Sequence, residues 1–380
     1  MAAATDPVLP HGVLVHDWVE VTGGSENVLE VIADLFPGTD LACSWMNAPD
    51  RFPARRVVET AVARTPLRGR KALALTALAA AWRVMPNDDY RWALVSSHSF
   101  AHHCRFRGTG PGFAKLVYVH SPARYLWEPS LDHRGQGRLV RLAAAPLRHL
   151  DRRRAQEARA LAANSAYVAE RIRRHWGRDS TVIHPPVEVA EIQAVEDWSS
   201  RLTPAEQAVL AELPEDFLLG ASRLIPYKRL DLALATGSAS GLPVVIAGEG
   251  PELPRLRRLA ADRQIRAHFV GRVSTPLLRA LFQRAQSFVF PAVEDFGIMP
   301  VEAMAVGTPV IVGSVGGALE TVLPGVTGAQ VRDWDDPEEL HRAVRASAAC
   351  RPADCRDRAR QFSRARFETD LLDWIGRNLN

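Results

Sequence analysis

Short apolar runs recur along the chain, and most are followed by a stretch with helical spacing. A buried strand is expected at residues 12–17, and apolar residues then recur with a helical period from Val28 to Leu35. The other strand-like runs are residues 41–45, 92–97, 115–120, 161–165, 181–187, 217–223, 244–247, 269–273, 288–290 and 308–312. Regular alternation of strand and helix predicts α/β domains built on open sheets.

The alternation forms two series, separated by a stretch with little periodicity. Residues 1–187 are predicted to form a first domain and residues 216–358 a second, a division that suits a chain of 380 residues. The stretch 188–215 carries several acids and few apolar residues in any period, so we expect a linker there. Residues 359–380 are predicted to form a final helix.

Composition narrows the class of protein. The chain is 47% hydrophobic and 24% charged, which suits a globular protein. Its net charge of +4 is modest, and local basic clusters say more about anionic partners than this total does. No nucleic-acid partner is expected. The first twenty residues lack the basic region of a signal peptide, and no apolar run approaches the length of a membrane span. The cysteines Cys43, Cys104, Cys350 and Cys355 are scattered, which predicts a reduced cytoplasmic protein without structural zinc.

Candidate chemistry gathers after the apolar run 288–290. Glu294 follows this run, Pro300 stands where a helix can begin, Glu302 lies inside that helix and Gly307 ends it. Ligands of open α/β sheets bind beyond the carboxyl ends of strands, and helix N-termini favour anions. Two carboxylate acceptors beside an anion site suit a ligand that is part phosphate and part polyol, such as a nucleotide sugar. The spacing alone fits two solvated glutamates equally well.

The residues around this pair resemble the donor-site signature of the family 4 retaining glycosyltransferases, a family of group 1 glycosyltransferases. From Glu294 the chain reads E-D-F-G-I-M-P-V-E-A-M-A-V-G-T-P-V-I, followed by Gly316-Gly317 and Glu320. The resemblance implies the GT-B fold, in which two Rossmann-like domains face each other across a cleft and the C-terminal helix crosses back to the N-terminal domain. It also implies that Glu294 positions sugar hydroxyls and that further donor contacts come from Asp295, Phe296, Gly297, Ile298 and Glu302.

Two basic residues bracket a strand-to-helix turn of the second domain. Arg223 and Lys228 stand in S-R-L-I-P-Y-K-R, where arginine can bind phosphate by two parallel hydrogen bonds and lysine acts as a mobile point charge. By themselves they could be ordinary surface bases. The resemblance implies that they clamp the donor diphosphate, and that Gly271, Arg272 and Val273 contact the nucleobase.

The first domain carries a glycine turn and a histidine at expected strand ends. The turn Gly23-Gly24 lacks a complete G-x-G-x-x-G, so it does not predict NAD. His120 begins H-S-P-A-R-Y-L-W, which resembles a sub-group of the family with many mannosyltransferases of bacterial surface glycans. The resemblance implies that the glycine turn lies near the donor phosphates, that His120 contacts the donor sugar, and that Arg124 and Tyr125 contact the acceptor.

Two patterns that look like metal sites have plainer interpretations. Three histidines and Cys104 lie within residues 98–104, but no second cluster completes a site, so we expect a strand-to-helix loop. The D-W-D at residues 333–335 leads into Asp336-Pro337, which reads as a helix N-cap with acids in the first turn. We therefore expect neither a metal nor another cofactor.

Two basic stretches, residues 64–86 and 138–159, are predicted to be helices. The first opens with arginines and continues in alanine and leucine, a composition that can lie on an anionic bilayer. A packed helix with solvated arginines fits equally well. Peripheral contact with the inner face of the cell membrane is therefore a hypothesis.

Together these features predict a retaining, metal-independent hexosyltransferase. The expected donor is GDP-mannose, with UDP-sugars second, and the expected acceptor is a glycan or a lipid-linked precursor of bacterial surface glycoconjugates. No carboxylate is obviously placed as a nucleophile, so front-face attack is implied by the resemblance. A nucleotide-sugar epimerase of the same architecture and a non-catalytic nucleotide-sugar-binding partner remain open as alternatives.

Overall fold

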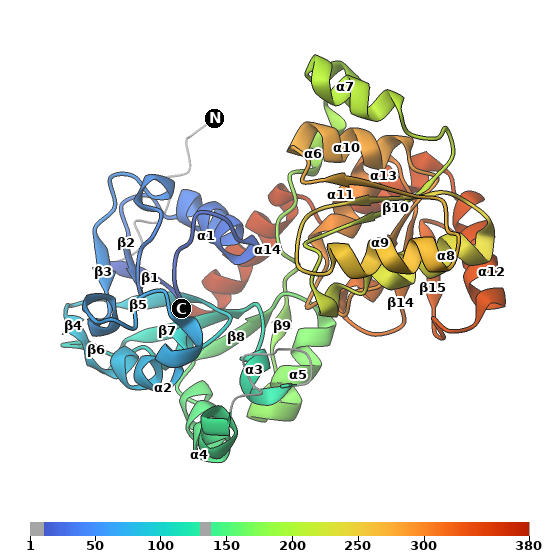
Figure 1. Cartoon of the computed structure of the whole chain (residues 1–380). Helices are drawn as coiled ribbons and strands as arrows, with labels where there is room; N and C mark the ends of the chain where they lie inside the picture. The colour runs from blue at the N-terminus through green and yellow to red at the C-terminus, as the bar shows by residue number, and fades with distance from the viewer. Residues whose placement is uncertain (1–10, 130–137, 380) are drawn as a thin grey trace, which may run out of the picture. The chain divides into compact units, whose positions relative to one another are not determined.

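The computed structural model describes residues 11–129 and 138–379, which form two compact units. The first unit comprises the residues up to His184 together with those from Phe367 onward, and the second comprises Pro185–Arg366. Figure 1 colours the chain from blue to red, and the red helix α14, Arg364–Leu379, lies among the elements of the first unit. The chain therefore returns to its first unit at its end.

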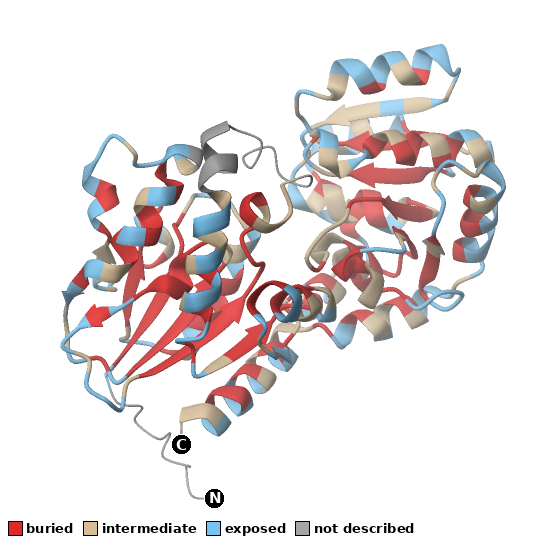
Figure 2. Ribbon diagram, turned by 90° about the horizontal axis from the view of Figure 1, so that it is seen from below, coloured by how far each residue is buried: buried red, intermediate tan, exposed pale blue. Residues whose placement is uncertain are grey.

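The first unit is built on a parallel sheet of seven strands in the order β3-β2-β1-β5-β7-β8-β9. Their bounds are β1 Gly12–His16, β2 Asp40–Cys43, β3 Val57–Glu59, β5 Trp92–Ser97, β7 Ala114–Val119, β8 Ala160–Ala163 and β9 Thr181–Val182. A separate two-stranded sheet pairs β4, Met85–Asn87, with β6, Phe106–Arg107. The five inner strands, β2, β1, β5, β7 and β8, are almost wholly buried and appear red in Figure 2, whereas the edge strands β3 and β9 are partly or fully exposed.

Helices cover both faces of this sheet. The helices and 3-10 turns of the unit besides α14 are α1 Gly24–Leu35, η1 Pro49–Arg51, η2 Ala61–Arg64, α2 Lys71–Ala81, η3 Trp82–Val84, η4 Ala101–His103, α3 Arg124–Trp127, α4 Arg138–Ala155 and α5 Ala166–Trp176. Val13 and Val15 pack with α2 and α5 on one face, whereas Leu14 packs with α1 and α14 on the other. This two-sided burial explains the continuous apolar runs of the strands. The helix predicted over residues 64–86 is shorter, because Pro66 and Gly69 interrupt the chain before Lys71.

The second unit holds a parallel sheet of six strands in the order β12-β11-β10-β13-β14-β15. Their bounds are β10 Leu218–Ala221, β11 Val244–Ala247, β12 Ala267–Gly271, β13 Ser287–Phe290, β14 Val310–Gly313 and β15 Gly328–Val331. Its helices and 3-10 turns are α6 Val189–Gln193, η6 Trp198–Arg201, α7 Pro204–Ala211, η7 Pro226–Lys228, α8 Leu230–Ser240, α9 Leu253–Asp262, α10 Thr275–Arg284, α11 Ile298–Val306, η8 Gly317–Glu320, α12 Pro337–Ala348 and α13 Pro352–Arg360. The predicted α/β class is confirmed, with two Rossmann-like parallel sheets.

The stretch 188–215, predicted to be a linker, is instead folded into the second unit as α6, η6 and α7. A few isolated apolar residues anchor it: Val189 and Trp198 are buried in the core of that unit. The final stretch also differs from the prediction. Ala359 belongs to the second unit's core, whereas Phe367 packs in the first unit. Widely spaced anchors produce no periodic signal, which is why the pattern alone misses them.

Each sheet has one point where the strand order reverses. In the first unit, β1 continues outward to β2 on one side, and β5 continues to β7 on the other. In the second unit the reversal lies between β10 and β13. Loops diverge at such a switch point, and the crevice outside the carboxyl ends of the strands is where doubly wound sheets bind ligands. Functional residues are therefore expected at the two switch points.

Candidate functional site

The switch point of the second unit brings together three predicted site residues. Arg223 follows β10, Lys228 ends η7 and Glu294 follows β13. The Lys228 ammonium forms an ion pair with the Glu294 carboxylate across 66 positions of sequence. The exposed Arg223 guanidinium contacts the hydroxyl of Tyr227, with Nη2 and the oxygen 3.2 Å apart. A neutral partner leaves the charge of Arg223 uncompensated, so this guanidinium can bind an anion.

Glycines allow the loops after β10 and β11 to approach each other closely enough to hold Arg223. The Leu224 N–H donates to the Glu249 carbonyl at 2.8 Å, and the Gly248 N–H donates to the Gly271 carbonyl at 2.7 Å. A Cβ on Gly248 would lie 1.8 Å from the Ser222 carbonyl oxygen, and one on Gly250 only 2.3 Å from that of Leu224. Both glycines also have positive φ. Sequence reasoning assigned no function to these two glycines, although the G-E-G pattern at a strand end is a usable signal.

The N-terminus of α11 lies beside Glu294. The helix begins at Ile298, two residues before Pro300, and its N-cap Gly297 has φ 111°. The Gly317 N–H donates to the Glu294 carbonyl at 2.7 Å, and a Cβ on Gly317 would lie 2.1 Å from the Asp295 carbonyl. The glycine pair predicted from the sequence therefore permits η8 to pack against the loop before α11, which fixes the orientation of the helix N-terminus.

The other residues predicted to contact the donor differ in their surroundings. Phe296 is buried and its ring packs 5.6 Å from that of Phe362, so its side chain belongs to the core. Burial raises the pKa of Glu302, although the positive charge of Arg279 acts to lower it. Gly271, Arg272 and Val273 lie at and just beyond the end of β12, two strands from β10 in the sheet. Gly271 and Val273 are partly exposed, and Arg272 is exposed.

The switch point of the first unit is organised by Asp17, which directly follows β1. One carboxylate oxygen of Asp17 accepts the backbone N–H groups of His98 at 2.7 Å and Ser99 at 2.8 Å. The other accepts those of Phe100 at 2.7 Å and Ala101 at 2.8 Å. Four charge-assisted hydrogen bonds on one buried carboxylate fix the loop after β5. Sequence reasoning missed Asp17, although a carboxylate at the end of the first strand is a usable signal.

His120, at the end of β7, lies in a buried cluster at the same switch point. Its Nε2 is 2.7 Å from the Ser96 hydroxyl, which in turn is 3.0 Å from Nδ1 of His16. Burial, reinforced by the neighbouring His16 and His98, holds the pKa of His120 well below its ordinary value. Burial likewise lowers the pKa of His16 to about 3. Both imidazoles are therefore neutral near pH 7.

The glycine turn of the first unit opens helix α1. Gly23 is the N-cap, and a Cβ there would lie 2.0 Å from the Glu26 carboxylate. The Glu26 carboxylate accepts the Ser25 hydroxyl at 2.7 Å and the Glu20 N–H at 3.3 Å, and burial raises its pKa. The Glu26 carboxylate lies at the N-terminus of α1. An anion bound at Gly23-Gly24 would therefore face this carboxylate instead of free backbone N–H groups. A side chain at position 23 would therefore have to displace the Glu26 carboxylate from this place.

The two predicted acceptor residues lie on the short helix α3. Arg124 is its first residue and is partly exposed. Tyr125 is buried, and its hydroxyl lies 2.7 Å from that of Ser99. Because Ser99 is also bound by Asp17, the position of α3 depends on the same carboxylate as the loop after β5.

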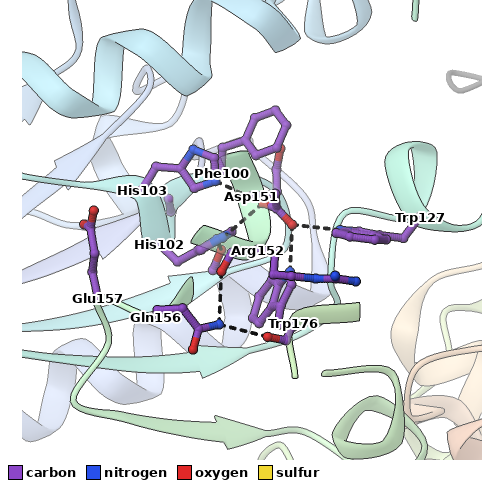
Figure 3. Close-up of polar contacts among 12 residues, drawn as sticks. Phe100, His102, His103, Trp127, Asp151, Arg152, Gln156, Glu157 and Trp176 are labelled. Carbon is purple, nitrogen blue, oxygen red and sulfur yellow. Dashed lines mark hydrogen bonds and ion pairs between the residues drawn. The ribbon is translucent and has the colours of Figure 1, made fainter. Parts of the chain in front are cut away.

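The histidines near Cys104 form a cluster that sequence reasoning did not anticipate, because its centre is Asp151 on α4. His103 Nε2 lies 2.9 Å and His102 Nε2 3.1 Å from one carboxylate oxygen. The indole N–H groups of Trp127 and Trp176 both donate to the other oxygen at 2.7 Å (Figure 3). His and Asp are metal-ligand types, but here each carboxylate oxygen already has two nitrogen neighbours. The arrangement serves as a structural joint between η4, α3, α4 and α5.

Two further expectations concern charge and membranes. The predicted N-cap of α12 is confirmed, since the Asp336 carboxylate accepts the Glu338 N–H at 2.9 Å. Within residues 11–129 and 138–379, no helix combines the length and the apolar character needed to cross a membrane.

Comparisons with known proteins place these features in context. A family model described as glycosyl transferases group 1 matches residues 205–366, and one described as Glycosyltransferase Family 4 matches residues 23–191. A GDP-mannose-dependent alpha-(1-6)-phosphatidylinositol monomannoside mannosyltransferase of Mycolicibacterium smegmatis is 32% identical over 195 residues, which are 47% of this chain and 50% of the relative. A D-inositol 3-phosphate glycosyltransferase of Geodermatophilus obscurus is 32% identical over 244 residues, 57% of this chain and 52% of the relative. The chain thus spans about half the length of the curated relatives it matches.

Solved structures resemble nearly the whole chain. Anabaena Alr3699/HepE in complex with UDP and glucose has a TM-score of 0.66 at 18% identity, covering 96% of this chain and 99% of its own. Sucrose-phosphate synthase (tll1590) from Thermosynechococcus elongatus has a TM-score of 0.69 at 19% identity, covering 97% and 98%. At these identities the likeness concerns the fold alone, and it confirms the predicted GT-B fold with its two Rossmann-like units.

Proposed function

Because the chain belongs to the family 4, group 1 glycosyltransferases, we propose that it transfers a hexose from a nucleotide sugar to an acceptor with retention of anomeric configuration. The observation that carries this proposal is the meeting of Arg223, Lys228 and Glu294 at the switch point of the second unit. These residues combine cations for a diphosphate with a carboxylate for sugar hydroxyls. They lie where doubly wound sheets bind ligands.

The leaving nucleoside diphosphate gains negative charge as its bond to the sugar breaks. Arg223 and Lys228 would stabilise that charge, together with the backbone N–H groups at the start of α11. Lys228 is already paired with Glu294, so it would be shared between the carboxylate and a phosphate oxygen. With this cationic set, the reaction needs no metal ion, and we propose a metal-independent enzyme without a cofactor.

The sugar and the ribose would be held by hydrogen bonds to their hydroxyls. Glu294 would accept bonds from the hexose and Glu302 from the ribose, while His120 would contact the hexose from the first unit. The raised pKa of Glu302 supports a role as a hydroxyl partner, because a carboxyl with less charge repels a nearby phosphate less. Attack of the acceptor on the same face from which the diphosphate leaves accounts for retention.

We propose GDP-mannose as the donor. This choice is supported by the relatives of 32% and 33% identity whose names state that they depend on GDP-mannose. A UDP-sugar is the alternative, which the solved complexes of a structural relative with UDP and with UDP-glucose support. The acceptor proposed is a glycan or a lipid-linked precursor, since relatives are named for phosphatidylinositol monomannoside.

We also propose that the first unit makes peripheral contact with an anionic membrane. Leu73 on α2 is 63% exposed, and the exposed Arg64 and Arg70 flank that helix. Arg68 is otherwise engaged, since it donates to the Met46 carbonyl at 2.6 Å. Co-sedimentation with anionic vesicles at low salt tests this: Leu73→Glu should reduce binding, whereas Leu372→Glu on α14 should not. Equal binding by all three proteins would contradict the proposal.

The donor is tested by thermal unfolding with GDP-mannose, UDP-glucose, UDP-GlcNAc and ADP-glucose, each with EDTA. Ligand at a hundredfold excess over its dissociation constant should stabilise the fold by about 2.7 kcal/mol. Arg223→Ala should abolish the shift, and Arg229→Ala is the matched control, because Arg229 is paired with Asp231. A shift that survives Arg223→Ala would contradict the proposed clamp.

Transfer itself separates the proposal from its rivals. Incubation of the donor with a panel of glycan and lipid-linked acceptors should yield nucleoside diphosphate and a glycosylated product. Conversion of free donor to an epimer without acceptor would favour an epimerase. Donor binding with neither transfer nor hydrolysis across the panel would favour a non-catalytic binding partner.

A further inference from the structure

The hydroxyl of Ser96 bridges two histidines that come from different strands. Ser96 Oγ lies 2.7 Å from Nε2 of His120 and 3.0 Å from Nδ1 of His16. All three side chains are buried. Sequence reasoning singled out only His120, and the proposed reaction does not by itself use the other two.

The register of the sheet places these side chains on one face. His16 pairs with Ser96 across β1 and β5, and Ser96 pairs with Tyr118 across β5 and β7. Paired residues of neighbouring strands share a face, and so do residues two apart in one strand. His120 lies two residues after Tyr118, so its side chain returns to the face that carries His16 and Ser96. The bridge is therefore a product of strand register.

The position of the hydrogen on His16 follows from a second contact. His16 Nδ1 also lies 3.1 Å from the backbone carbonyl oxygen of Ser96. A carbonyl oxygen can only accept, so Nδ1 of the neutral imidazole must carry the hydrogen. That N–H is shared between the carbonyl oxygen and Oγ of Ser96, and the Ser96 hydroxyl is then an acceptor toward His16.

The hydrogen of the Ser96 hydroxyl is consequently directed to His120. At 2.7 Å, Nε2 of His120 is the remaining neighbour of Oγ, and it can accept only if it carries no hydrogen. The reverse orientation would leave the hydroxyl hydrogen without an acceptor among the residues that the structure describes. A neutral imidazole carries one hydrogen, so the hydrogen of His120 is on Nδ1. No residue in the described part of the chain hydrogen-bonds that atom.

We propose that Ser96 and His16 are positioning residues that hold His120 in its Nδ1–H tautomer, so that this histidine presents a hydrogen-bond donor to an oxygen of the sugar donor. The tautomer follows from contacts within the protein alone, whereas its use on a sugar rests on the proposed function. The low pKa of His120 is consistent with this arrangement, because a neutral ring retains a single, directed N–H.

Nitrogen NMR of protein labelled with ¹⁵N-histidine tests the tautomer directly. Two-bond proton–nitrogen spectra distinguish protonated from unprotonated ring nitrogens, and the His120→Gln spectrum identifies the signals of His120. The wild type should show an unprotonated Nε2 and a protonated Nδ1. Ser96→Ala should give a mixture of tautomers, whereas Ser97→Ala should leave the pattern unchanged, because Ser97 contacts His102. A protonated Nε2 in the wild type, or an unchanged pattern in Ser96→Ala, would overturn the proposal.

Kinetics of hexose transfer then test its use. Ser96→Ala should lower kcat by about tenfold with little change in KM for the nucleotide sugar, because one oriented hydrogen bond is lost in the transition state. Ser96→Cys, which retains a weak donor, should fall between the two proteins, and Ser97→Ala should keep full activity. Thermal unfolding of the serine variants shows whether each is folded. Equal kcat for Ser96→Ala and Ser97→Ala would contradict the role in transfer. If the wild type transfers no sugar, the proposed function fails while the NMR measurement still decides the tautomer.

Discussion

The two switch points occupy equivalent places in two similar sheets, yet they are built from opposite chemistry. At the second-unit switch point, between β10 and β13, ionised side chains stay partly exposed, with Arg223 beside a neutral hydroxyl. At the first-unit switch point, between β1 and β5, His16 and His120 are buried and held neutral. Under the proposed function, the residues of the second unit would stabilise charge, and those of the first unit would orient neutral hydrogen-bonding groups.

The loops at these points are also held by different means. In the second unit, glycines with positive φ let adjacent loops approach, as Gly248 approaches Ser222. In the first unit, the Asp17 carboxylate gathers four backbone N–H groups of the loop after β5. Backbone packing leaves room for an anionic ligand, whereas a buried carboxylate would repel one. This difference agrees with the proposed function, in which the donor diphosphate binds at the second unit.

The largest expected effect is on the charged switch point. Arg223→Ala should lower kcat by roughly 100-fold or more, in the range seen when one preorganised donor to a developing anion is removed. The fold should stay intact, because the guanidinium is exposed and its only hydrogen-bond partner among the described residues is Tyr227. Steady-state transfer kinetics measure this loss, with Arg229→Ala as control. A loss of less than threefold would remove Arg223 from the proposed clamp.

The close approach of the loops after β10 and β11 can be disrupted at Gly248. A Cβ there would lie 1.8 Å from the Ser222 carbonyl oxygen, and φ is +133°, so Gly248→Ala must displace the loop that carries Arg223. We expect a loss of about 4 kcal/mol in the free energy of unfolding. Gly241→Ala is the matched control: its φ is +74°, and nothing lies within 4 Å of the added Cβ. Chemical denaturation measures both, and equal losses would show that conformation, not crowding, dominates at Gly248.

The hydrogen bonds that hold the loop after β5 can be disrupted at Asp17. Asp17→Asn replaces one of two acceptor oxygens by a donor and so leaves part of the four N–H groups unsatisfied. Because three of the four residues, Ser99, Phe100 and Ala101, are buried, we expect the free energy of unfolding to fall by about 3 kcal/mol. Amide exchange followed by mass spectrometry should show lost protection in residues 98–101 first. Unchanged exchange in that loop would contradict the role given to Asp17.

Lowering the pH should destabilise the first unit more than the second. Burial lowers the pKa of His103 to about 4 from an ordinary value of 6.5. Between these pH values the unfolded chain binds more protons than the folded one, so stability is lost as the pH falls. For His103 alone the loss between pH 7 and pH 5 is about 2 kcal/mol.

The other buried groups of the first unit act in the same direction. The pKa of His16 is lowered to about 3, mainly by burial. Burial opposes charge on Asp151, but His102 and His103 outweigh it and hold the pKa of that carboxyl below its usual range, so its contribution is lost only at still lower pH. Amide exchange at pH 7 and pH 5 should show the first unit opening before the second. Because His11 is exposed, His11→Gln should leave this difference unchanged. Equal loss of amide protection in both units at pH 5 would contradict the prediction.

Much of the fold could be predicted because its signals are local. Strands such as 115–120 are marked by consecutive β-branched and aromatic residues, and the turn at Gly307 by a residue that tolerates its φ of 103°. The charged site residues could be named because they stand at strand ends within a continuous motif. The stretch 188–215 was misjudged because its packing rests on five irregularly spaced apolar residues: Val189, Ile192, Trp198, Leu202 and Leu213.

The sequence by itself thus determined the alternation of strands and helices and the family motif around Glu294, since both depend on neighbours along the chain. Only the tertiary structure decided which distant residues act together. Lys228 meets Glu294, and Ser96 joins His16 to His120, because strand order and register bring carboxyl ends to one edge of a sheet. Such contacts depend on packing across the whole unit, so no local pattern of residues can specify them.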